Sequence, residues 1–264
     1  MSCKKILLPM FLALSVSNCM PVCAQASGTF TVAYGAHVTL DPKRMNRGDF
    51  SDGMISALSG MVGNSIPVGD VTDTVSFSKD SYRIQSSGVV GRMLGSFMSK
   101  GTFVRTSDGL IVDGSIATIR YVDIRASNPP LTTLVDLKTN HIYFYSGKSV
   151  TSTVTSKGRI KDLLSLGYSF IGNLPSGAVT TSLSDGKSIK NATFDVKKDE
   201  TQLNASLVPC VKLTRRIVSP DDASVEYWLR ATDGLPLRVR IGMSQRYGAV
   251  LDLKATRVPE KVAR

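Results

Sequence analysis

Apolar and polar residues alternate along most of this 264-residue chain, and no sustained helical periodicity is present. Residues 29–34 show the alternation clearly, as do residues 75–78 and 81–85, which flank Lys79-Asp80 like the two strands of a hairpin. Successive side chains of a strand point to opposite faces of a sheet, so this period of two predicts strands with one buried face. Further strands are expected at residues 102–106, 116–122, 132–137, 142–145, 192–197, 210–218, 224–231, 237–243 and 249–256.

Turn-forming dipeptides separate these expected strands: Asp108-Gly109, Asp113-Gly114, Thr139-Asn140, Asp185-Gly186 and Asp233-Gly234. Gly, Asn and Asp adopt the left-handed backbone that tight hairpin turns require. Many short strands with turns at this spacing indicate an all-β, mostly antiparallel fold, either an open, curled sheet or an incomplete barrel. No internal repeat or linker divides the chain, so residues 27–264 are expected to form one β-rich domain.

Three segments break the alternation and predict one to three short helices. Residues 87–98 place apolar side chains at helical spacing before Gly101, which indicates an amphipathic helix lying on the sheet. Residues 161–168 (KDLLSLGY) suggest one or two helical turns. Residues 51–69 combine apolar residues with Gly and Ser, and they predict a third helix or a flap.

The first 26 residues have the three zones of a secretory signal. Lys4 and Lys5 precede an apolar run, residues 6–16, that is too short to cross a bilayer. Ala24 and Ala26 satisfy the small-x-small rule of signal peptidase, so cleavage is expected after Ala26. The alternative is a lipoprotein signal with Cys19 as the lipidated residue, although the preceding Asn18 fits that pattern poorly. We therefore expect a periplasmic protein with no transmembrane segment after cleavage.

Removal of this signal changes the inventory of cysteines and charges. Cys3, Cys19 and Cys23 leave with it, so Cys210 has no partner for an intramolecular disulfide. Cys210 lies in an apolar run, where a buried and unreactive thiol is expected. The remaining 30 basic and 21 acidic residues leave a net charge of +9. The basic residues are dispersed, and an exported protein does not meet nucleic acid, so we expect no nucleic-acid partner.

The sequence motifs of common catalytic and metal sites are missing. His37 and His141 have no metal-ligand spacing, and no Cys-x-x-Cys, Gly-x-Ser-x-Gly or Gly-x-Gly-x-x-Gly motif is present. Residues 95–102 resemble a phosphate loop but have the order Lys-Gly-Thr instead of Gly-Lys-Ser/Thr. The acid pairs Asp70/Asp73, Asp199-Glu200 and Asp221-Asp222 are expected in solvated turns and not as catalytic dyads. We therefore expect a protein that is not an enzyme and that uses no metal or cofactor.

Aromatic residues and arginines are the remaining candidates for binding. The aromatics Tyr143, Tyr145, Tyr168, Phe170, Tyr227 and Trp228 are expected either to pack in the core or to line an apolar cavity of the open sheet. Arg230, Arg238 and Arg240 follow one another at strand-like intervals. They predict either a solvated sheet face or a surface that contacts anionic lipid or polymer.

Residues 226–240 (EYWLRATDGLPLRVR) resemble the C-terminal hairpin of the DUF3108 family, bacterial envelope proteins of uncharacterised function. Other segments follow the family's order: residues 30–34, Tyr82-Arg83-Ile84, Val135-Asp136-Leu137, residues 162–166 and Leu174-Pro175-Ser176-Gly177. The family's Gly-rich strand after the first tyrosine is not visible, residues 41–69 look like an insertion, and a proline expected near Leu110 is missing. The resemblance implies a β-rich envelope domain and no particular activity.

Two functions are compatible with these observations. The first is a non-enzymatic periplasmic protein that binds an apolar or amphipathic envelope component, such as a lipid, in a cavity of the sheet. The second is a structural or interaction module for envelope assembly, with a filled core and no ligand. A cavity lined by the aromatics would favour the first function, and a packed interior would favour the second.

Overall fold

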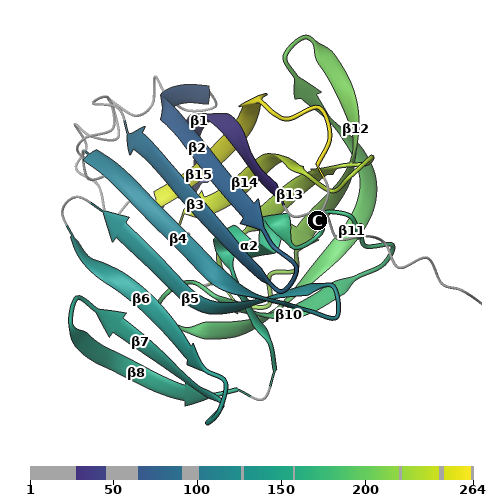
Figure 1. The fold of residues 1–264 in the computed structure, drawn as a ribbon. Coiled ribbons are helices and arrows are strands. Elements are labelled where there is room, and N and C mark those ends of the chain that lie inside the picture. Colours follow the sequence, from purple (N-terminus) through teal and green to yellow (C-terminus); the bar gives the residue numbers. More distant parts are fainter. Residues whose placement is uncertain are drawn as a thin grey trace, which may run out of the picture.

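One continuous sheet makes up nearly all of the computed structural model, which describes residues 28–45, 65–90, 101–125, 128–156, 158–219, 222–243 and 247–262. The sheet has 15 strands in the order β8-β7-β6-β5-β4-β3-β2-β1-β15-β14-β13-β12-β11-β10-β9 (Figure 1). Neighbouring strands are antiparallel except β9 and β10, which are parallel. The two outer strands, β8 and β9, are not paired with each other, so the sheet is open. The predicted all-β, mostly antiparallel, open fold is confirmed.

Fifteen strands and one helix are described along the chain. Their bounds are β1 Gly28–Met45, β2 Ser65–Phe77, β3 Ser81–Val90, β4 Gly101–Val112, β5 Ser115–Arg125, β6 Asn128–Asp136, β7 His141–Ser146, β8 Ser149–Thr155, β9 Ile160–Asp162, α2 Leu163–Tyr168, β10 Val179–Ser184, β11 Ile189–Leu203, β12 Ser206–Arg215, β13 Val225–Arg230, β14 Pro236–Met243 and β15 Tyr247–Arg257.

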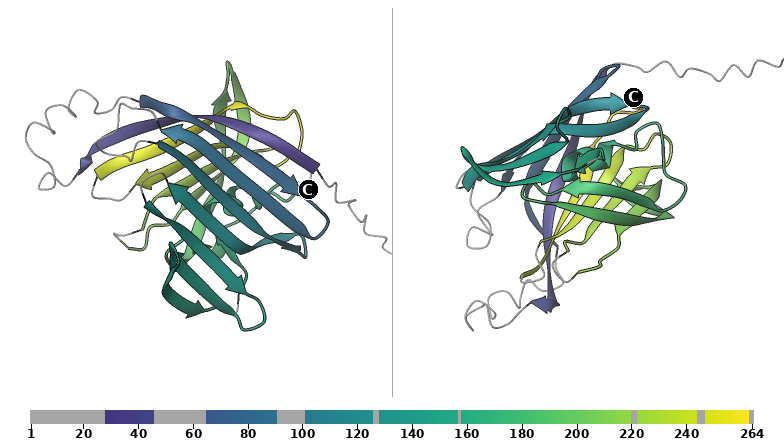
Figure 2. Two further views of the ribbon diagram at one scale, coloured as in Figure 1. Left: turned by 60° about the vertical axis from the view of Figure 1, so that its left-hand side comes forward. Right: turned by 90° about the horizontal axis from the view of Figure 1, so that it is seen from below.

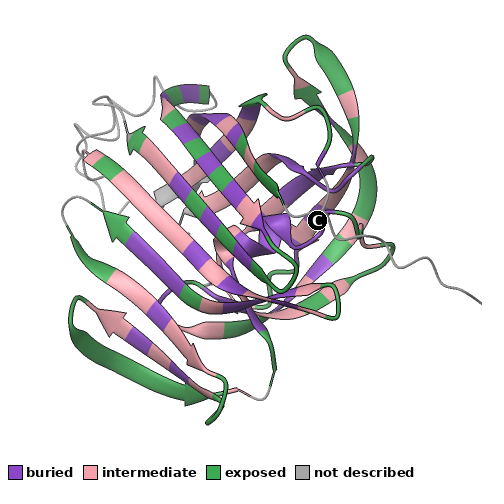
Figure 3. Ribbon diagram, in the orientation of Figure 1, coloured by how far each residue is buried: buried purple, intermediate pink, exposed green. Residues whose placement is uncertain are grey.

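The helix α2 lies inside the curl of the sheet (Figures 1 and 2). It contacts β3, β4 and β5 from one half of the sheet and β14 from the other half. Buried side chains alternate with exposed ones along the strands (Figure 3), as the sequence pattern predicts. Two core clusters meet α2, one centred on β1–β3 and one on β11–β13. The apolar inner face of the sheet therefore becomes buried because the sheet curls around the helix.

The helix predictions have different outcomes. The segment 161–168 does contain a helix, which begins after Asp162. In contrast, residues 87–90 continue β3 and pair with both β2 and β4, so a helix beginning at residue 87 is wrong; residues 91–98 lie outside the described part. Residues 65–69 of the third segment belong to β2, and residues 51–64 lie outside the described part. Pairing on both sides decides the structure of residues 87–90, against their helical spacing.

Four of the five predicted turns connect elements, and one lies within a strand. Asp113, Asn140, Gly186 and Gly234 all have positive φ at their turns. Asp108-Gly109 instead lies inside β4, where the register with β5 shifts. A Cβ at residue 109 would meet the carbonyl oxygen of Ala117 and would lie 2.6 Å from the ring of Tyr82. This glycine therefore allows close backbone approach at a bulge and makes no turn.

Candidate functional site

The carboxylate of Asp162 joins α2 to the inner face of the sheet, in a group that we call the helix-cap cluster: Tyr82, Ser107, Thr118, Asp162 and Ser165. Its Oδ2 accepts hydrogen bonds from Ser107 (2.6 Å) and Thr118 (2.8 Å). Its Oδ1 accepts from the backbone N–H groups of Leu164 and Ser165 (2.9 and 2.8 Å). Burial raises the pKa of Asp162, and these hydrogen bonds oppose the rise. Every oxygen of this carboxylate has protein partners.

The polar groups of the buried aromatics Tyr227 and Trp228 also have hydrogen-bond partners within the protein. The hydroxyl of Tyr227 donates to the carbonyl oxygen of Leu163 at 2.8 Å, and the indole N–H of Trp228 donates to Asp199 at 3.1 Å. Of the six aromatics that the sequence singled out, Tyr168, Phe170, Tyr227 and Trp228 are buried in the core clusters. Tyr143 and Tyr145 are partly exposed on β7, where they alternate with the buried Ile142 and Phe144. The structure therefore places four of the six in the packed interior.

A chain of hydroxyls leads from α2 to a buried carboxyl group on β2. The Tyr34 hydroxyl donates to the carbonyl oxygen of Pro236 (2.8 Å) and lies 3.2 Å from the Tyr168 hydroxyl. Tyr168 in turn donates to Oδ2 of Asp73 at 2.7 Å. Burial raises the pKa of Asp73, although Ser86, Tyr168 and Arg105 lower it by smaller amounts. In the described part of the chain, Oδ1 of Asp73 is buried and has no hydrogen-bond partner.

Asp73 was expected in a solvated turn, and that prediction is wrong. It is 6% exposed on the inner face of β2, between the buried residues Val71 and Val75. The alternation of Val71, Asp73, Val75 and Phe77 is the sequence signal that could have placed it there, because residues two apart share a face. The distance between Asp70 and Asp73 in the sequence carried no such information.

The residues paired with Asp73 across β2–β5 form a polar row on the inner face. Asp73 pairs with Ser86, Ser86 with Arg105, and Arg105 with Asp123. Residues paired across antiparallel strands point to the same face, so all four face the interior. We call these four residues and Arg125 the arginine row. It begins at Asp73, where the hydroxyl chain from α2 ends.

Two guanidinium groups of the arginine row share one carboxylate. Nη2 of Arg125 lies 2.7 Å from Asp123, and Nε of Arg105 lies 3.4 Å from it. Burial raises the pKa of Asp123, but the hydrogen bonds and charges of Arg125 and Arg105 outweigh it and hold the pKa below 3.8. Nε of Arg105 is buried without a hydrogen-bond partner in the described residues, and the side chain is 28% exposed.

An aromatic ring lies beside this row. The Arg105 guanidinium lies 5.0 Å from the ring centroid of Phe103, which is partly buried against the core. Gly88 pairs with Phe103, and a Cβ at Gly88 would lie only 2.7 Å from the Phe103 ring. The absence of a side chain at Gly88 therefore lets the Phe103 ring pack closely against β3. The inner face here combines cationic, acidic and apolar groups.

The three arginines predicted for an anionic surface are each paired with a carboxylate. Arg230 is 8% exposed and forms two hydrogen bonds with Asp233 (2.8 and 2.6 Å), which leaves it no free face for such a surface. Arg238 binds Asp252 and lies over the ring of Trp228, 4.6 Å from its centroid. Arg240 pairs with Glu226 at 3.1 Å. These pairs bind β13–β15 together on the outer face of the hairpin.

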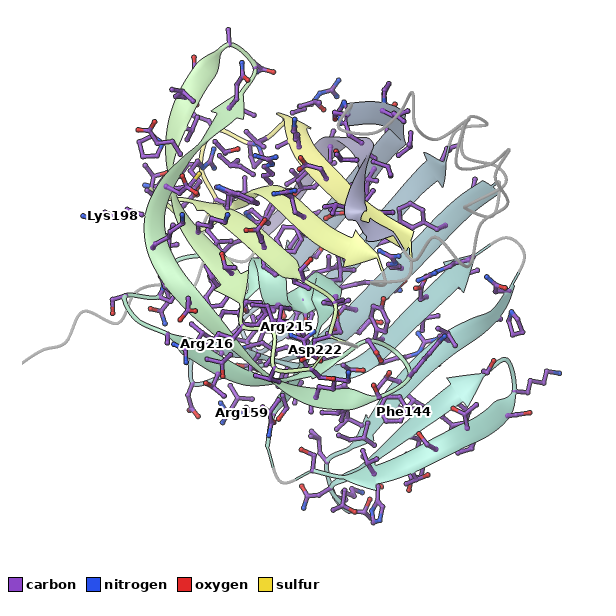
Figure 4. All side chains as sticks on the ribbon, turned by 180° about the vertical axis from the view of Figure 1, so that it is seen from behind. Phe144, Arg159, Lys198, Arg215, Arg216 and Asp222 are labelled. Carbon is purple, nitrogen blue, oxygen red and sulfur yellow. The ribbon has the colours of Figure 1, made fainter. Side chains whose placement is uncertain are left out.

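Sequence reasoning also missed a buried ion pair. Asp222 was expected in a solvated turn, but it is 5% exposed and lies 3.0 Å from Arg215. Figure 4, a view from behind, shows the two side chains close together. Burial raises the pKa of Asp222, but Lys190, Arg215 and nearby backbone N–H groups together bring it below 3.8. This pair ties β12 to the segment that precedes β13.

The cysteine and the two histidines that the sequence singled out lie outside the helix-cap cluster and the arginine row. Cys210 is free and buried as predicted, and burial raises the pKa of its thiol to about 11. His37 and His141 lie apart, on β1 and β7. Among the described residues, no three His, Cys, Asp or Glu side chains gather as metal ligands would. In the same part of the chain, no helix is both long and apolar enough to cross a membrane. Ala24 and Ala26 lie outside the described residues.

No family model matches the chain, and no curated protein is similar to it. The resemblance to DUF3108 therefore stays a prediction. Within the hairpin that carries this resemblance, Pro236 begins β14, which has neighbouring strands on both sides. The first position of a strand is a place where the missing N–H of proline is tolerated.

Proposed function

We propose that this protein is a non-enzymatic envelope protein that binds an amphipathic ligand on the inner face of its sheet, at the arginine row. One observation carries the proposal. Oδ1 of Asp73 is buried with no hydrogen-bond partner in the described residues, and Nε of Arg105, on the same face two strands away, has only its 3.4 Å ion pair with Asp123. Buried polar atoms without good hydrogen bonds are unfavourable, so a ligand that pairs with both atoms gains free energy.

The charges of the row favour an anionic head group. Arg105 and Arg125 place two guanidinium groups on the single carboxylate of Asp123, which leaves cationic groups available to an anion. Burial raises the pKa of Asp73, which makes this carboxyl group easier to protonate beside such an anion. A carboxylate or phosphate oxygen would accept from Arg105, and a protonated Asp73 would donate to the same head group. Phe103 offers an apolar surface next to the head group. Fatty acids and lysophospholipids of the envelope have this chemistry.

Native mass spectrometry of protein purified from the periplasm tests the proposal first. A co-purifying lipid supports it. Titration with a fluorescent fatty acid and with a lysophospholipid that has a phosphoglycerol head then tests the site. Arg105→Gln is expected to weaken binding by about ten- to a hundredfold, since a charge-assisted hydrogen bond contributes roughly 1.5–3 kcal/mol.

Arg216→Gln is the matched control, because Arg216 also pairs with an aspartate, Asp195, but is exposed. Its affinity should stay within about twofold of the unmodified protein. A bare mass, together with no binding of either probe, would overturn the proposal. Equal losses in the two variants would overturn the position of the site.

A second candidate function is an interaction module of the envelope with no ligand. The observation that favours it is the filled interior. Tyr168, Phe170 and Tyr227 are buried near α2, Trp228 is buried on the opposite face of β13 beneath Lys212 and Arg238, and all four are at most 7% exposed. The hydroxyls of Tyr168 and Tyr227 and the indole of Trp228 have protein partners and need no ligand. Native mass spectra without lipid at any step of purification would favour this function over the first.

A further inference from the structure

The two outer strands of the sheet are protected to very different degrees. β9 has three residues, and both Ile160 and Asp162 are buried against the rest of the fold. β8 has seven residues (SVTSTVT), all of them exposed, and its two valines, Val150 and Val154, are 53% and 38% exposed. It contains no proline and no charged residue, the features that usually protect a free edge from pairing with another chain.

Among the described residues, no strand pairs with the outer side of β8, and the positions of its unpaired backbone groups follow from its pairing with β7. The N–H of Ser156 donates to the carbonyl oxygen of Asn140 at 3.0 Å, so the pair Asn140 and Ser156 is hydrogen-bonded. Hydrogen-bonded and non-hydrogen-bonded pairs alternate along an antiparallel ladder. Thr153 and Thr155, opposite Tyr143 and His141, are therefore non-hydrogen-bonded pairs. Their N–H and C=O groups point away from β7, towards the free side.

The sequence of this part of the edge is the same in both directions. Residues 152–156 read Ser-Thr-Val-Thr-Ser, a palindrome centred on Val154. The one irregularity in β8 leaves Thr151 without a partner on β7, so it falls just outside the palindrome. Within the palindrome, the side chain of Val154 shares the inner face with Ile142, whereas Thr153 and Thr155 share the outer face with Tyr143 and His141.

We propose that two copies of this chain pair through β8, antiparallel, about a two-fold axis at Val154. In this register Thr153 of each copy exchanges two backbone hydrogen bonds with Thr155 of the other copy. Ser152 lies opposite Ser156, and the two Val154 residues face each other in a non-hydrogen-bonded pair, the closest type of side-chain contact between strands. An isologous contact needs this self-complementary arrangement, and an uncharged strand lets two basic proteins meet without repulsion at the contact.

Light scattering coupled to size exclusion, at concentrations up to about 100 µM, tests the pairing, since small interfaces have dissociation constants in the micromolar range or weaker. The unmodified protein is expected to approach twice the monomer mass as concentration rises. Val154→Lys and Val154→Glu each place two like charges at the axis, so both variants should be monomers. An equimolar mixture of the two variants should recover the dimer, because Lys then faces Glu.

A second pair of variants tests the backbone contact. Thr153→Pro removes an N–H that points away from β7 and has no bond within the described part of the fold, and it should abolish the dimer. Thr153→Val keeps that N–H and should retain the dimer. Unchanged circular dichroism and melting temperature show that each variant is folded. A monomeric unmodified protein, a dimer that survives Val154→Lys, or a mixture that stays monomeric would each overturn the proposal.

Discussion

The helix-cap cluster and the arginine row have members two residues apart on β4, Ser107 and Arg105, yet their polar groups are satisfied in different ways. In the helix-cap cluster, both oxygens of Asp162 have two donors each, and the N–H groups that begin α2 receive their acceptors. In the arginine row, two guanidiniums share one carboxylate, and Oδ1 of Asp73 has no partner in the described residues. Buried polar groups therefore stabilise the fold in the helix-cap cluster, whereas those of the arginine row keep unused hydrogen-bonding capacity for a ligand.

The largest effect is expected from removing the centre of the helix-cap cluster. Asp162→Ala leaves the hydroxyls of Ser107 and Thr118 and two N–H groups of α2 without their acceptor. We expect the free energy of unfolding, measured with urea, to fall by about 3–5 kcal/mol. Asp162→Asn keeps an acceptor for the helix N–H groups, so it should lose clearly less. An equal loss in both variants would show that packing, and not capping, is what Asp162 contributes.

A smaller effect is expected from the tyrosine that joins the two regions. Tyr168→Phe removes the donor to Oδ2 of Asp73 and the contact with the Tyr34 hydroxyl, but it keeps the ring in the core. The free energy of unfolding should fall by about 1–3 kcal/mol, the usual loss when a buried acceptor loses its partner. Tyr143→Phe, on a partly exposed tyrosine, is the control and should change stability by less than about 0.5 kcal/mol.

The pH dependence of stability should separate Asp73 from Asp123. The pKa of Asp73 is raised in the folded protein. The stability that Asp73 contributes is therefore complete at pH values below its ordinary pKa of 3.8, and it is lost as pH rises through the folded pKa. Asp73→Asn resembles the protonated carboxyl group and should remove this loss. Urea unfolding at a series of pH values from about 4 to 8 should show the variant gaining on the unmodified protein as pH rises.

Asp123 provides the opposite sign within the same row. The pKa of Asp123 is lowered in the folded protein. The stability that Asp123 contributes is therefore present at pH values above its ordinary pKa of 3.8, and it is lost as pH falls through the folded pKa. Asp123→Asn should therefore be less stable than the unmodified protein near pH 7, and the difference should shrink as pH falls. If both aspartate variants shifted in the same direction with pH, the contrast between the two carboxyl groups would be incorrect.

The smallest effect on stability is expected at the exposed member of the row. The side chain of Arg125 is 49% exposed, so its ion pair with Asp123 is screened by solvent. Arg125→Ala should lower the free energy of unfolding by no more than about 1 kcal/mol. The same variant should weaken binding of the fluorescent fatty acid. A large loss of stability with unchanged binding would show that Arg125 stabilises the fold and does not contact the ligand.

Much of the architecture could be predicted from the sequence because it depends on local patterns. The alternation in residues 75–78 and 81–85 predicts the hairpin of β2 and β3, and the pairing of Phe77 with Tyr82 confirms it. The segment 161–168 contains the predicted helix, and four of the five predicted turns connect elements. β8 was not predicted, since all of its residues are exposed and its sequence has no apolar face to reveal it.

The position of the polar residues in the interior could not be predicted in this way. Asp73, Ser86, Arg105 and Asp123 come from four strands, and only the register of β2–β5 places them in one row. The six aromatics were expected either in the core or along a cavity, and only the folded sheet decided that four of them are buried in the core. Arg230 looked like a surface cation because its partner, Asp233, lies across a turn and is brought close only by the folded hairpin.

The sequence by itself determined that this chain forms strands with one apolar face, because side-chain alternation acts over a few residues and needs no distant contact. It also determined the tight turns, through residues that tolerate positive φ. Only the tertiary structure decided which polar groups are partnered and which are not. That outcome depends on strand register and on the position of α2 inside the sheet. Both are set by contacts between residues as far apart in the sequence as Asp73 and Tyr168.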